Sequence, residues 1–406
     1  MEPKKRWDGY TSFSYLRADE DYRSFELAKQ IERVAPTVVP LDAEQEARAE
    51  RLLRTLICIS LHEHGGILPL DPHDNEAYVR QGREFYGFEG MAASGLDAVF
   101  ENFLDGTAAI TSAGGWKWED VIFDLGMHLA DVAHQTTMFL GTGVADIERA
   151  HETGRIALIA CIEGAAPIEN ELDRLDILYG LGVRMIGVAY SESNQLGGGV
   201  RDPGDGGLTV FGRQAVRRMN RLGMAIDLSH TGDLTAMQTC ELSERPVFLS
   251  HSGARALYPE MKLKTDELLR AVADTGGVIG IEAAPYTTTL VGVPHTLETV
   301  MAHMEYCIDV MGIDHVAFGP DTLFGDHVGL YQHFGAHLNS GDEADHLPVD
   351  HVAGLENPSE FSNVLRWLVA HGYTDEQIGK LAGGNIIRAL RDVWVERLPD
   401  AQPRHS

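Results

Sequence analysis

Short apolar runs alternate with amphipathic stretches along most of this chain. Each run is largely apolar, which is typical of a parallel strand buried on both faces. The runs expected to form strands are Leu56–Leu61, Ala108–Ser112, Ile156–Ile162, Val183–Ala189, Met224–Leu228, Val247–Leu249, Val278–Ile281 and Val316–Phe318. Stretches with helical periodicity, such as Gly212–Leu222 and Asp266–Thr275, lie between them. The chain is therefore expected to alternate strand and helix.

This alternation predicts an α/β fold, namely a (β/α)8 TIM barrel. The prediction of eight strands depends on Ala108–Ser112, which has the weakest strand pattern of the set. A doubly wound open sheet is the alternative. No Gly-x-Gly-x-x-Gly motif follows the first strand, which argues against a dinucleotide-binding sheet of that kind.

Two units are expected. Residues 1–54 should form an N-terminal helical extension packed on the barrel, because the stretch from Leu41 to Leu56 contains strong helix formers and no helix breaker. Residues 55–398 should form the barrel. Within it, residues 65–106 are expected to be an enlarged first βα loop, which either covers a pocket or simply packs against the barrel.

Residues suited to metal binding follow the predicted strands. Chemistry in a TIM barrel sits at the carboxyl ends of the strands, so these residues should meet at one mouth. The residues found there are His62 and His64 after the first strand, Glu163 after the third, Tyr190 after the fourth, His230 after the fifth, His251 after the sixth and Asp321 after the eighth. All except Tyr190 are common metal ligands.

Each of these residues also has an ordinary structural interpretation. A lone histidine at a strand end can be a hydrogen-bonded core residue, and Asp321 in Gly319-Pro320-Asp321 can be a turn residue. Glu163 follows a buried strand and needs a partner there, for which an arginine would also serve. His62 and His64 are two residues apart, so their side chains face the same way on an extended strand.

Taken together, the six ligand-type residues favour a metal site. They exceed what one catalytic zinc requires, which suggests two divalent ions bridged by a carboxylate. Such a pair lowers the pKa of a shared water, and the resulting hydroxide can attack a carbonyl. Among the other histidines, His327 is the one we expect to come nearest this site.

Composition limits the classes of partner and compartment. The chain carries 33 Lys and Arg against 61 Asp and Glu, a formal net charge of −28, which argues against nucleic acid or an anionic membrane as the main partner. No apolar run approaches the roughly 18–20 residues of a membrane span, and no signal peptide is expected. Four widely spaced cysteines suggest reduced, buried thiols. We therefore expect a cytoplasmic protein.

Several motifs together resemble the membrane (renal) dipeptidase family of the amidohydrolase superfamily. They are Asp227-Leu228-Ser229-His230, Pro246-Val247-Phe248-Leu249-Ser250-His251-Ser252, Gly312-Ile313-Asp314-His315-Val316-Ala317-Phe318-Gly319-Pro320-Asp321 and Gly383-Gly384-Asn385 with Arg388. The segment from Tyr190 to Gly199 is similar to the version common in bacterial members. The resemblance covers the chain from about Ile57 to Trp394. It implies a (β/α)8 barrel with two ions, usually zinc, that hydrolyses dipeptides, and a possible homodimer.

The resemblance also implies a role for each site residue. Glu163 would bridge the two ions, with His62, His64 and Asp321 around one and His230 and His251 around the other. Asp321 would act as general base and then as general acid. Tyr190 would help steady the oxyanion, and Asn194 and Lys262 would complete the substrate-binding residues.

Three positions depart from the family pattern. His62-Glu63-His64 replaces the usual His-x-Asp, and imidazole remains a good zinc or iron ligand. Tyr190 stands where the best-studied members have histidine. Lys262 stands where the family has an arginine that binds the substrate's carboxylate, and the exchange is not conservative because lysine lacks the bidentate fork. Lys262 could equally be an ordinary solvated loop lysine.

The sequence therefore predicts a metal-dependent hydrolase, with two candidate hydrolytic reactions, and leaves one non-catalytic alternative. The first is cleavage of the amide bond of a dipeptide by a metal-activated water. The second is hydrolysis of a non-peptide amide, an N-acyl amino acid or a lactone, because the carboxylate-binding arginine is replaced by Lys262. The third, from a different class, is a catalytically silent barrel that serves in binding.

Overall fold

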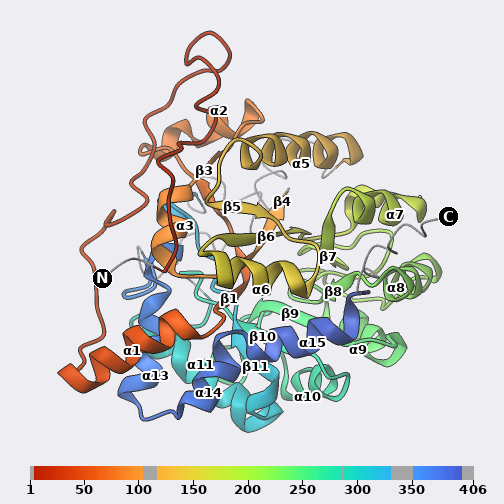
Figure 1. Cartoon of the computed structure of the whole chain (residues 1–406). Coiled ribbons are helices and arrows are strands. Elements are labelled where there is room, and N and C mark those ends of the chain that lie inside the picture. The colour runs from red at the N-terminus through yellow and green to blue at the C-terminus, as the bar shows by residue number, and fades with distance from the viewer. Residues whose placement is uncertain (1–3, 104–116, 286, 331–350, 396–406) are drawn as a thin grey trace, which may run out of the picture.

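A parallel sheet curls into a barrel at the centre of the computed structural model, which describes residues 4–103, 117–285, 287–330 and 351–395. The strands pair in the order β1-β4-β6-β7-β8-β9-β10-β11. Their bounds are β1 Ile59–Glu63, β4 Ala98–Phe103, β6 Ile156–Ile162, β7 Val183–Gly187, β8 Ala225–Asp227, β9 Phe248–Ser252, β10 Val278–Ile281 and β11 Val316–Phe318. This arrangement confirms the predicted α/β barrel (Figure 1).

Helices surround the sheet on its outer face (Figure 1). They are α1 Ala43–Thr55, α2 Asn75–Arg80, α3 Phe88–Ser94, α5 Trp118–Val132, α6 Val144–Thr153, α7 Asp173–Gly180, α8 Val210–Leu222, α9 Asp233–Leu242, α10 Asp266–Asp274, α11 Leu297–Met311, α13 Ser362–Ala370, α14 Asp375–Gly379 and α15 Asn385–Val393. Local sequence explains their limits, as in α10. The Thr265 side chain accepts a hydrogen bond from the Leu268 backbone at its start, and Gly276 with φ 82° follows its end.

The first and last barrel strands join just past their carboxyl ends. The Asp321 backbone N–H donates to His62 O at 3.1 Å, and the His64 N–H donates to Thr322 O at 3.0 Å. The Glu63 carboxylate accepts from both the backbone N–H (2.9 Å) and the hydroxyl (2.8 Å) of Thr322. The barrel is therefore closed at the end where the candidate ligands lie.

The second barrel strand differs from the predicted one. The predicted strand Ala108–Ser112 lies outside the described residues. The second strand of the barrel is β4, which falls inside the stretch assigned to the enlarged first loop. This strand was missed because Glu101 and Asn102 interrupt its apolar pattern. Both side chains are nevertheless buried. The first loop still carries α2, α3 and the short hairpin β2 Gly66–Ile67 with β3 Phe85–Tyr86, while β5 Met138–Leu140 pairs with β6 beside the barrel.

The N-terminal segment is less helical than predicted. Among the described residues before the barrel, α1 is the helix, whereas residues 4–42 form turns and isolated bridges. Pro36 and Pro40 and the left-handed backbone of Phe13 and Asp19 are incompatible with a continuous helix. The division of the chain into an extension (1–54) and a barrel (55–398) stays a prediction.

Two further expectations concern the membrane and the cysteines. Within the described parts of the chain, no helix is both long enough and apolar enough to cross a bilayer. The four cysteines, Cys58, Cys161, Cys240 and Cys307, are buried free thiols, as predicted.

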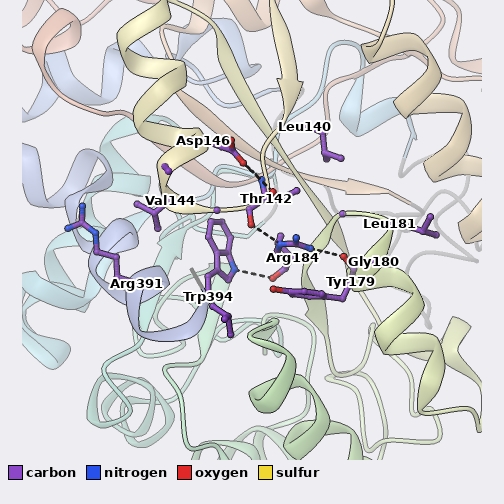
Figure 2. A pocket seen from close by; sticks show the side chains of 14 residues that line it. Leu140, Thr142, Val144, Asp146, Tyr179, Gly180, Leu181, Arg184, Arg391 and Trp394 are labelled. Carbon is purple, nitrogen blue, oxygen red and sulfur yellow. Dashed lines mark hydrogen bonds between the residues drawn. The ribbon is translucent and has the colours of Figure 1, made fainter. Parts of the chain in front are cut away.

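A cavity of about 660 Å³ opens beside the amino end of β7, away from the candidate ligands (Figure 2). Its polar side chains bind one another's backbone. The Arg184 guanidinium donates to Thr142 O (2.9 Å) and Tyr179 O (2.8 Å), and the Trp394 indole donates to Arg184 O (3.4 Å). Because these contacts hold neighbouring segments together, we assign the cavity a structural role.

Candidate metal centre

The barrel brings all six predicted ligand residues together. His62 lies on β1 and His251 on β9, and the other four follow the ends of barrel strands. Each side chain is buried or nearly so, and they fall into three overlapping groups whose ligand atoms lie within 4.8 Å of one another. The groups are His62, His64 and Glu163; His62, His251 and Asp321; and Glu163, His230 and His251.

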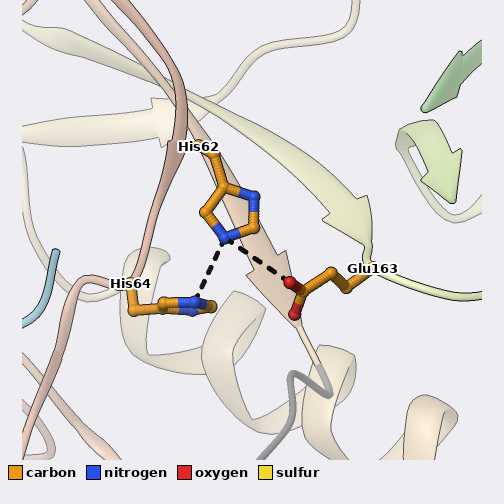
Figure 3. Close-up of side chains that lie close together, drawn as sticks. All are labelled: His62, His64 and Glu163. Atoms are coloured by element: carbon orange, nitrogen blue, oxygen red, sulfur yellow. Dashed lines mark hydrogen bonds and ion pairs between the residues drawn. The ribbon is translucent and has the colours of Figure 1, made fainter. Parts of the chain in front are cut away.

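One set of donor atoms gathers around Asp321. Its Oδ1 lies 3.3 Å from His62 Nε2 and 3.1 Å from His64 Nε2. The two imidazole nitrogens are 3.1 Å apart, and Figure 3 shows both rings turned toward each other and toward Glu163. His62 and His64 are two residues apart on an extended segment, and their side chains lie on the same side of it, as predicted.

A second set gathers around Glu163. Its Oε1 lies 2.9 Å from His230 Nε2 and 3.3 Å from His251 Nε2, and those nitrogens are 3.0 Å apart. The same Oε1 is 3.9 Å from His62 Nε2, a contact that Figure 3 draws, so Glu163 lies near both sets.

These spacings suit a small divalent cation. Donors bound at 2.0–2.1 Å around a tetrahedral ion are separated by about 3.3 Å from one another. Nitrogen and oxygen donors of this kind match the preferences of zinc and similar ions. The residues present therefore fit a metal, and the overlap of the groups at Glu163 fits a shared carboxylate.

Neighbouring side chains orient the imidazoles. The Ser250 hydroxyl donates to Asp227 Oδ2 at 2.8 Å and lies 2.8 Å from His251 Nδ1. Its oxygen can therefore accept a hydrogen bond from Nδ1–H, which leaves the lone pair of Nε2 available to a metal ion. The Asn102 amide lies 2.8 Å from His62 Nδ1 and fixes the orientation of that ring. Contacts of this type set the tautomer and the basicity of histidine ligands.

Burial sets the protonation of the cluster. Desolvation lowers the pKa of His62 and lowers those of His230 and His251 well below the usual value, so the rings stay neutral and keep a lone pair. Burial alone would raise the pKa of Asp321. The charge of Lys262 and the nearby imidazoles outweigh it and hold that pKa well below its usual range. The site is thus in the form that binds a cation.

Asp321 has a strained backbone. Its φ of 59° lies in the left-handed region, which residues other than glycine rarely adopt. The bond from its N–H to His62 O, together with a 2.7 Å bond from Ala283 N–H to Pro320 O, holds this turn against the barrel. These bonds hold Asp321 in the buried cluster, so it is not a surface turn residue.

Lys262 is buried, which contradicts its interpretation as a solvated loop lysine. Only 6% of the residue is exposed, and its Nζ lies 2.5 Å from Glu282 Oε1 and 3.2 Å from Asp321 Oδ2. Glu282 was not among the predicted site residues, although it directly follows the buried strand β10 as Glu163 follows β6. The rule applied to the other strand ends would have found it.

Of the other expected residues, Tyr190 and His327 lie beside the cluster, whereas Asn194 binds its own loop. The Tyr190 ring stacks on His230 with centroids 4.2 Å apart. The Asn194 amide donates to Val188 O (2.8 Å) and accepts from Leu196 N–H (2.7 Å), so it holds its own loop, and its role in substrate binding stays a prediction. His327 is buried, and burial lowers its pKa to about 4, against the influence of Asp321.

Glu101 was also missed, because β4 was not recognised. Its carboxylate accepts from Gly65 N–H at 2.9 Å and from the Tyr86 hydroxyl at 2.8 Å. Burial raises the pKa of Glu101 to about 7. These bonds anchor the segment that begins directly after His64.

Comparison with known proteins identifies the family. The model of the membrane dipeptidase family (peptidase family M19) matches residues 127–334. The chain belongs to this family. A relative from Klebsiella pneumoniae, the uncharacterized protein in the pqqA 5′ region, is 34% identical over 273 residues, covering 65% of this chain and 92% of that protein. Dipeptidase tcpJ of Claviceps purpurea is 31% identical, with 61% of this chain and 53% of that protein covered. The chain thus spans about half the length of this curated dipeptidase.

Solved structures of other proteins share the fold. An amidohydrolase from Pseudomonas aeruginosa has a TM-score of 0.73 at 24% identity, covering 86% of this chain and 99% of the other. A metallo peptidase from Rhodobacter sphaeroides, liganded with a phosphinate mimic of the dipeptide L-Ala-D-Ala, has a TM-score of 0.65 at 23% identity, covering 84% and 100%. As a membrane dipeptidase family member, this chain is a metallohydrolase of the amidohydrolase superfamily.

Proposed function

We propose that the chain hydrolyses the amide bond of a dipeptide, using water activated by two divalent ions. The observation that carries this proposal is the position of Glu163 Oε1, which lies within 3.9 Å of His62, His230 and His251. A carboxylate between two sets of imidazoles suits a bridging ligand. Membership of the membrane dipeptidase family favours a small peptide substrate.

The residues divide by role in this proposal. Glu163 would bridge the ions, with His62, His64 and Asp321 around one and His230 and His251 around the other. The histidine-rich donor set favours zinc. Bound ions would supply a water of lowered pKa and polarise the substrate carbonyl.

The protein's own side chains then move the protons and hold the substrate. Asp321 takes a proton from the attacking water and returns it to the leaving amine. Tyr190, stacked on His230, supplies a hydroxyl donor for the oxyanion. Asn194 orders the loop that follows Tyr190 and belongs to the substrate-binding region in this proposal. The burial of the cluster strengthens each of these electrostatic contacts.

A second candidate is hydrolysis of a non-peptide amide, an N-acyl amino acid or a lactone. The specific observation in its favour is that Lys262, at the position of the family's carboxylate-binding arginine, is bound to Glu282 and Asp321. A panel of L,L and L,D dipeptides, N-acyl amino acids and lactones distinguishes the two candidates by their kcat/KM values. Metal analysis of the same preparation should find about two ions per chain, as a bridged pair requires.

Replacing Asp321 tests the mechanism. Asp321→Asn should lower kcat by roughly 10²- to 10⁴-fold, because the general base is lost, while circular dichroism stays unchanged. The matched control is Asp173→Asn, whose carboxylate is 87% exposed beside Arg218 and should retain full turnover. A metal-free preparation with undiminished activity would contradict the proposal.

Two further properties are proposed, a homodimer from the family resemblance and a cytoplasmic location from the four buried free cysteines. Light scattering of the purified chain at micromolar concentration tests the first. Cell fractionation tests the second.

A further inference from the structure

A buried lysine links two carboxylates at the edge of the candidate metal centre. Lys262 lies on the loop after β9, whereas Glu282 and Asp321 follow the paired neighbouring strands β10 and β11. The ammonium is 2.5 Å from Glu282 Oε1 and 3.2 Å from Asp321 Oδ2. All three residues are at least nine-tenths buried. The lysine is therefore part of a fixed network.

The charge of Lys262 is already balanced inside this network. The single ammonium faces two carboxyl groups, that of Glu282 at 2.5 Å and that of Asp321 at 3.2 Å. These two groups supply the counter-charge of the lysine. A substrate carboxylate could bind the Lys262 ammonium only by sharing it with these two partners or by displacing one of them.

The same contact orients Asp321. Its Oδ1 faces His62 and His64, and its Oδ2 faces Lys262. An ammonium on one oxygen and imidazoles at the other fix the rotation of the carboxylate about its last side-chain bond. The left-handed backbone of Asp321 and its bond to His62 O fix the other end of the residue. The contact with Lys262 thus keeps Oδ1 of Asp321 pointing toward His62 and His64.

We propose that Lys262 is a positioning residue that Glu282 holds against Asp321, and that the site does not read a free carboxylate on its substrate. This inference rests on the hydrolysis proposed above for the same site. It predicts a substrate class in which a dipeptide and its C-terminal carboxamide are accepted alike.

The test compares matched ligands on the metal-loaded protein. The substrates are one dipeptide as free acid and as C-terminal amide, and the binding probes are phosphinate dipeptide mimics with the same two end groups, measured by calorimetry. In the wild type, acid and amide should differ by less than about threefold in KM and in Kd, because a compensated lysine gives little preference. A preference of tenfold or more for the acid overturns the proposal.

Two substitutions separate positioning from carboxylate recognition. Lys262→Met should lower kcat about 100-fold for both substrates, because Asp321 loses its orientation, and should leave the ratio of acid to amide KM unchanged. Lys262→Arg, which keeps the charge, should recover much of kcat for both substrates. If Lys262→Met raises KM for the acid alone, or if Lys262→Arg recovers no kcat, the proposal is wrong.

Controls separate this inference from the proposed function. Lys380→Met removes a lysine bound to Asp314 at 2.8 Å on the surface and should leave both kcat and KM unchanged. If Lys262→Met does not fold, the wild-type ratio and Lys262→Arg still decide. If the metal-loaded wild type cleaves neither substrate, the proposed function fails, while the Kd values of the two mimics still test the role of Lys262.

Discussion

The buried carboxylate of Asp97 holds together segments that are distant in the sequence. It lies at the base of β4, where it binds the ammonium groups of Lys4 and Lys5 and the His151 ring at 3.1 Å. It also accepts from the Cys58 N–H at 2.8 Å. Burial would raise the pKa of Asp97, but His151 and the two lysines together lower it to about 2.

This lowered pKa predicts a pH-dependent contribution to stability. Because the folded-state pKa lies below the unfolded value of 3.8, the stabilisation is complete above that value and is lost as pH falls through about 2. Asp97→Asn should therefore lower the free energy of unfolding by about 2 kcal/mol at pH 7, and by much less near pH 2. Urea unfolding of both proteins across this range measures the difference. Asp173→Asn should stay within about 0.5 kcal/mol of the wild type, and an equal effect of Asp97→Asn at both pH values would contradict the assignment.

Single residues differed in how readily the sequence revealed them. His62, His230, His251, Glu163 and Asp321 could be predicted to converge because each stands next to a recognisable buried strand. The partners of Lys262 could not, because a long side chain on a loop can reach several places and only the fold selects one. Asn102 was missed for another reason, since its strand was not recognised.

At the level of elements, close backbone contacts between strands fix where the ligands lie. Gly187 ends β7, and a Cβ placed there would stand 1.9 Å from Glu163 O. That atom is backbone, so it cannot move aside as a flexible side chain can. The strand pair β6 and β7 therefore requires glycine at this position.

Gly187→Ala should displace Glu163 as well as strain the sheet. We expect the free energy of unfolding to fall by about 1–3 kcal/mol, as for other overpacked sites, and metal affinity to fall with it. Chemical denaturation and metal titration by calorimetry measure the two effects. Gly126→Ala, on α5 with open space around the new Cβ, should instead be neutral or slightly stabilising. A Gly187→Ala protein that binds metal as tightly as the wild type would show that Glu163 is not held by this contact.

The elements that the sequence predicted well are those with uninterrupted apolar runs. Ile156–Ile162 forms β6 with the predicted bounds, and Val278–Ile281 and Val316–Phe318 also agree. The strand β4 was not predicted because it contains two buried polar residues, Glu101 and Asn102. These residues bind Gly65 N–H and the His62 ring at the candidate metal centre. Sequence patterns fail most readily where a strand carries functional groups, since there the local rule is broken.

For the whole molecule, bound metal should raise stability. Ions that bind only the folded chain stabilise it by an amount that grows with concentration, about 4 kcal/mol at 1,000 times Kd. Removal of metal by a chelator should thus lower the unfolding midpoint by several degrees, and added zinc should restore it; differential scanning calorimetry measures both. The double variant His230→Ala, His251→Ala should lose most of this response. A wild-type midpoint that a chelator leaves unchanged would contradict the proposed metal site.

The ends of β1 and β11 meet where the barrel closes, so an ion bound there would cross-link two distant parts of the chain. Glu63 and Thr322, which meet there, are 259 positions apart in the chain. An ion held by His62, His64 and Asp321 would cross-link the same two segments and act as a reversible counterpart of a disulfide. In the chain-entropy model a loop of this length lowers the entropy of the unfolded chain by an equivalent of roughly 5 kcal/mol. The metal would then tie the beginning of the barrel to its end in any partly unfolded state that retains it.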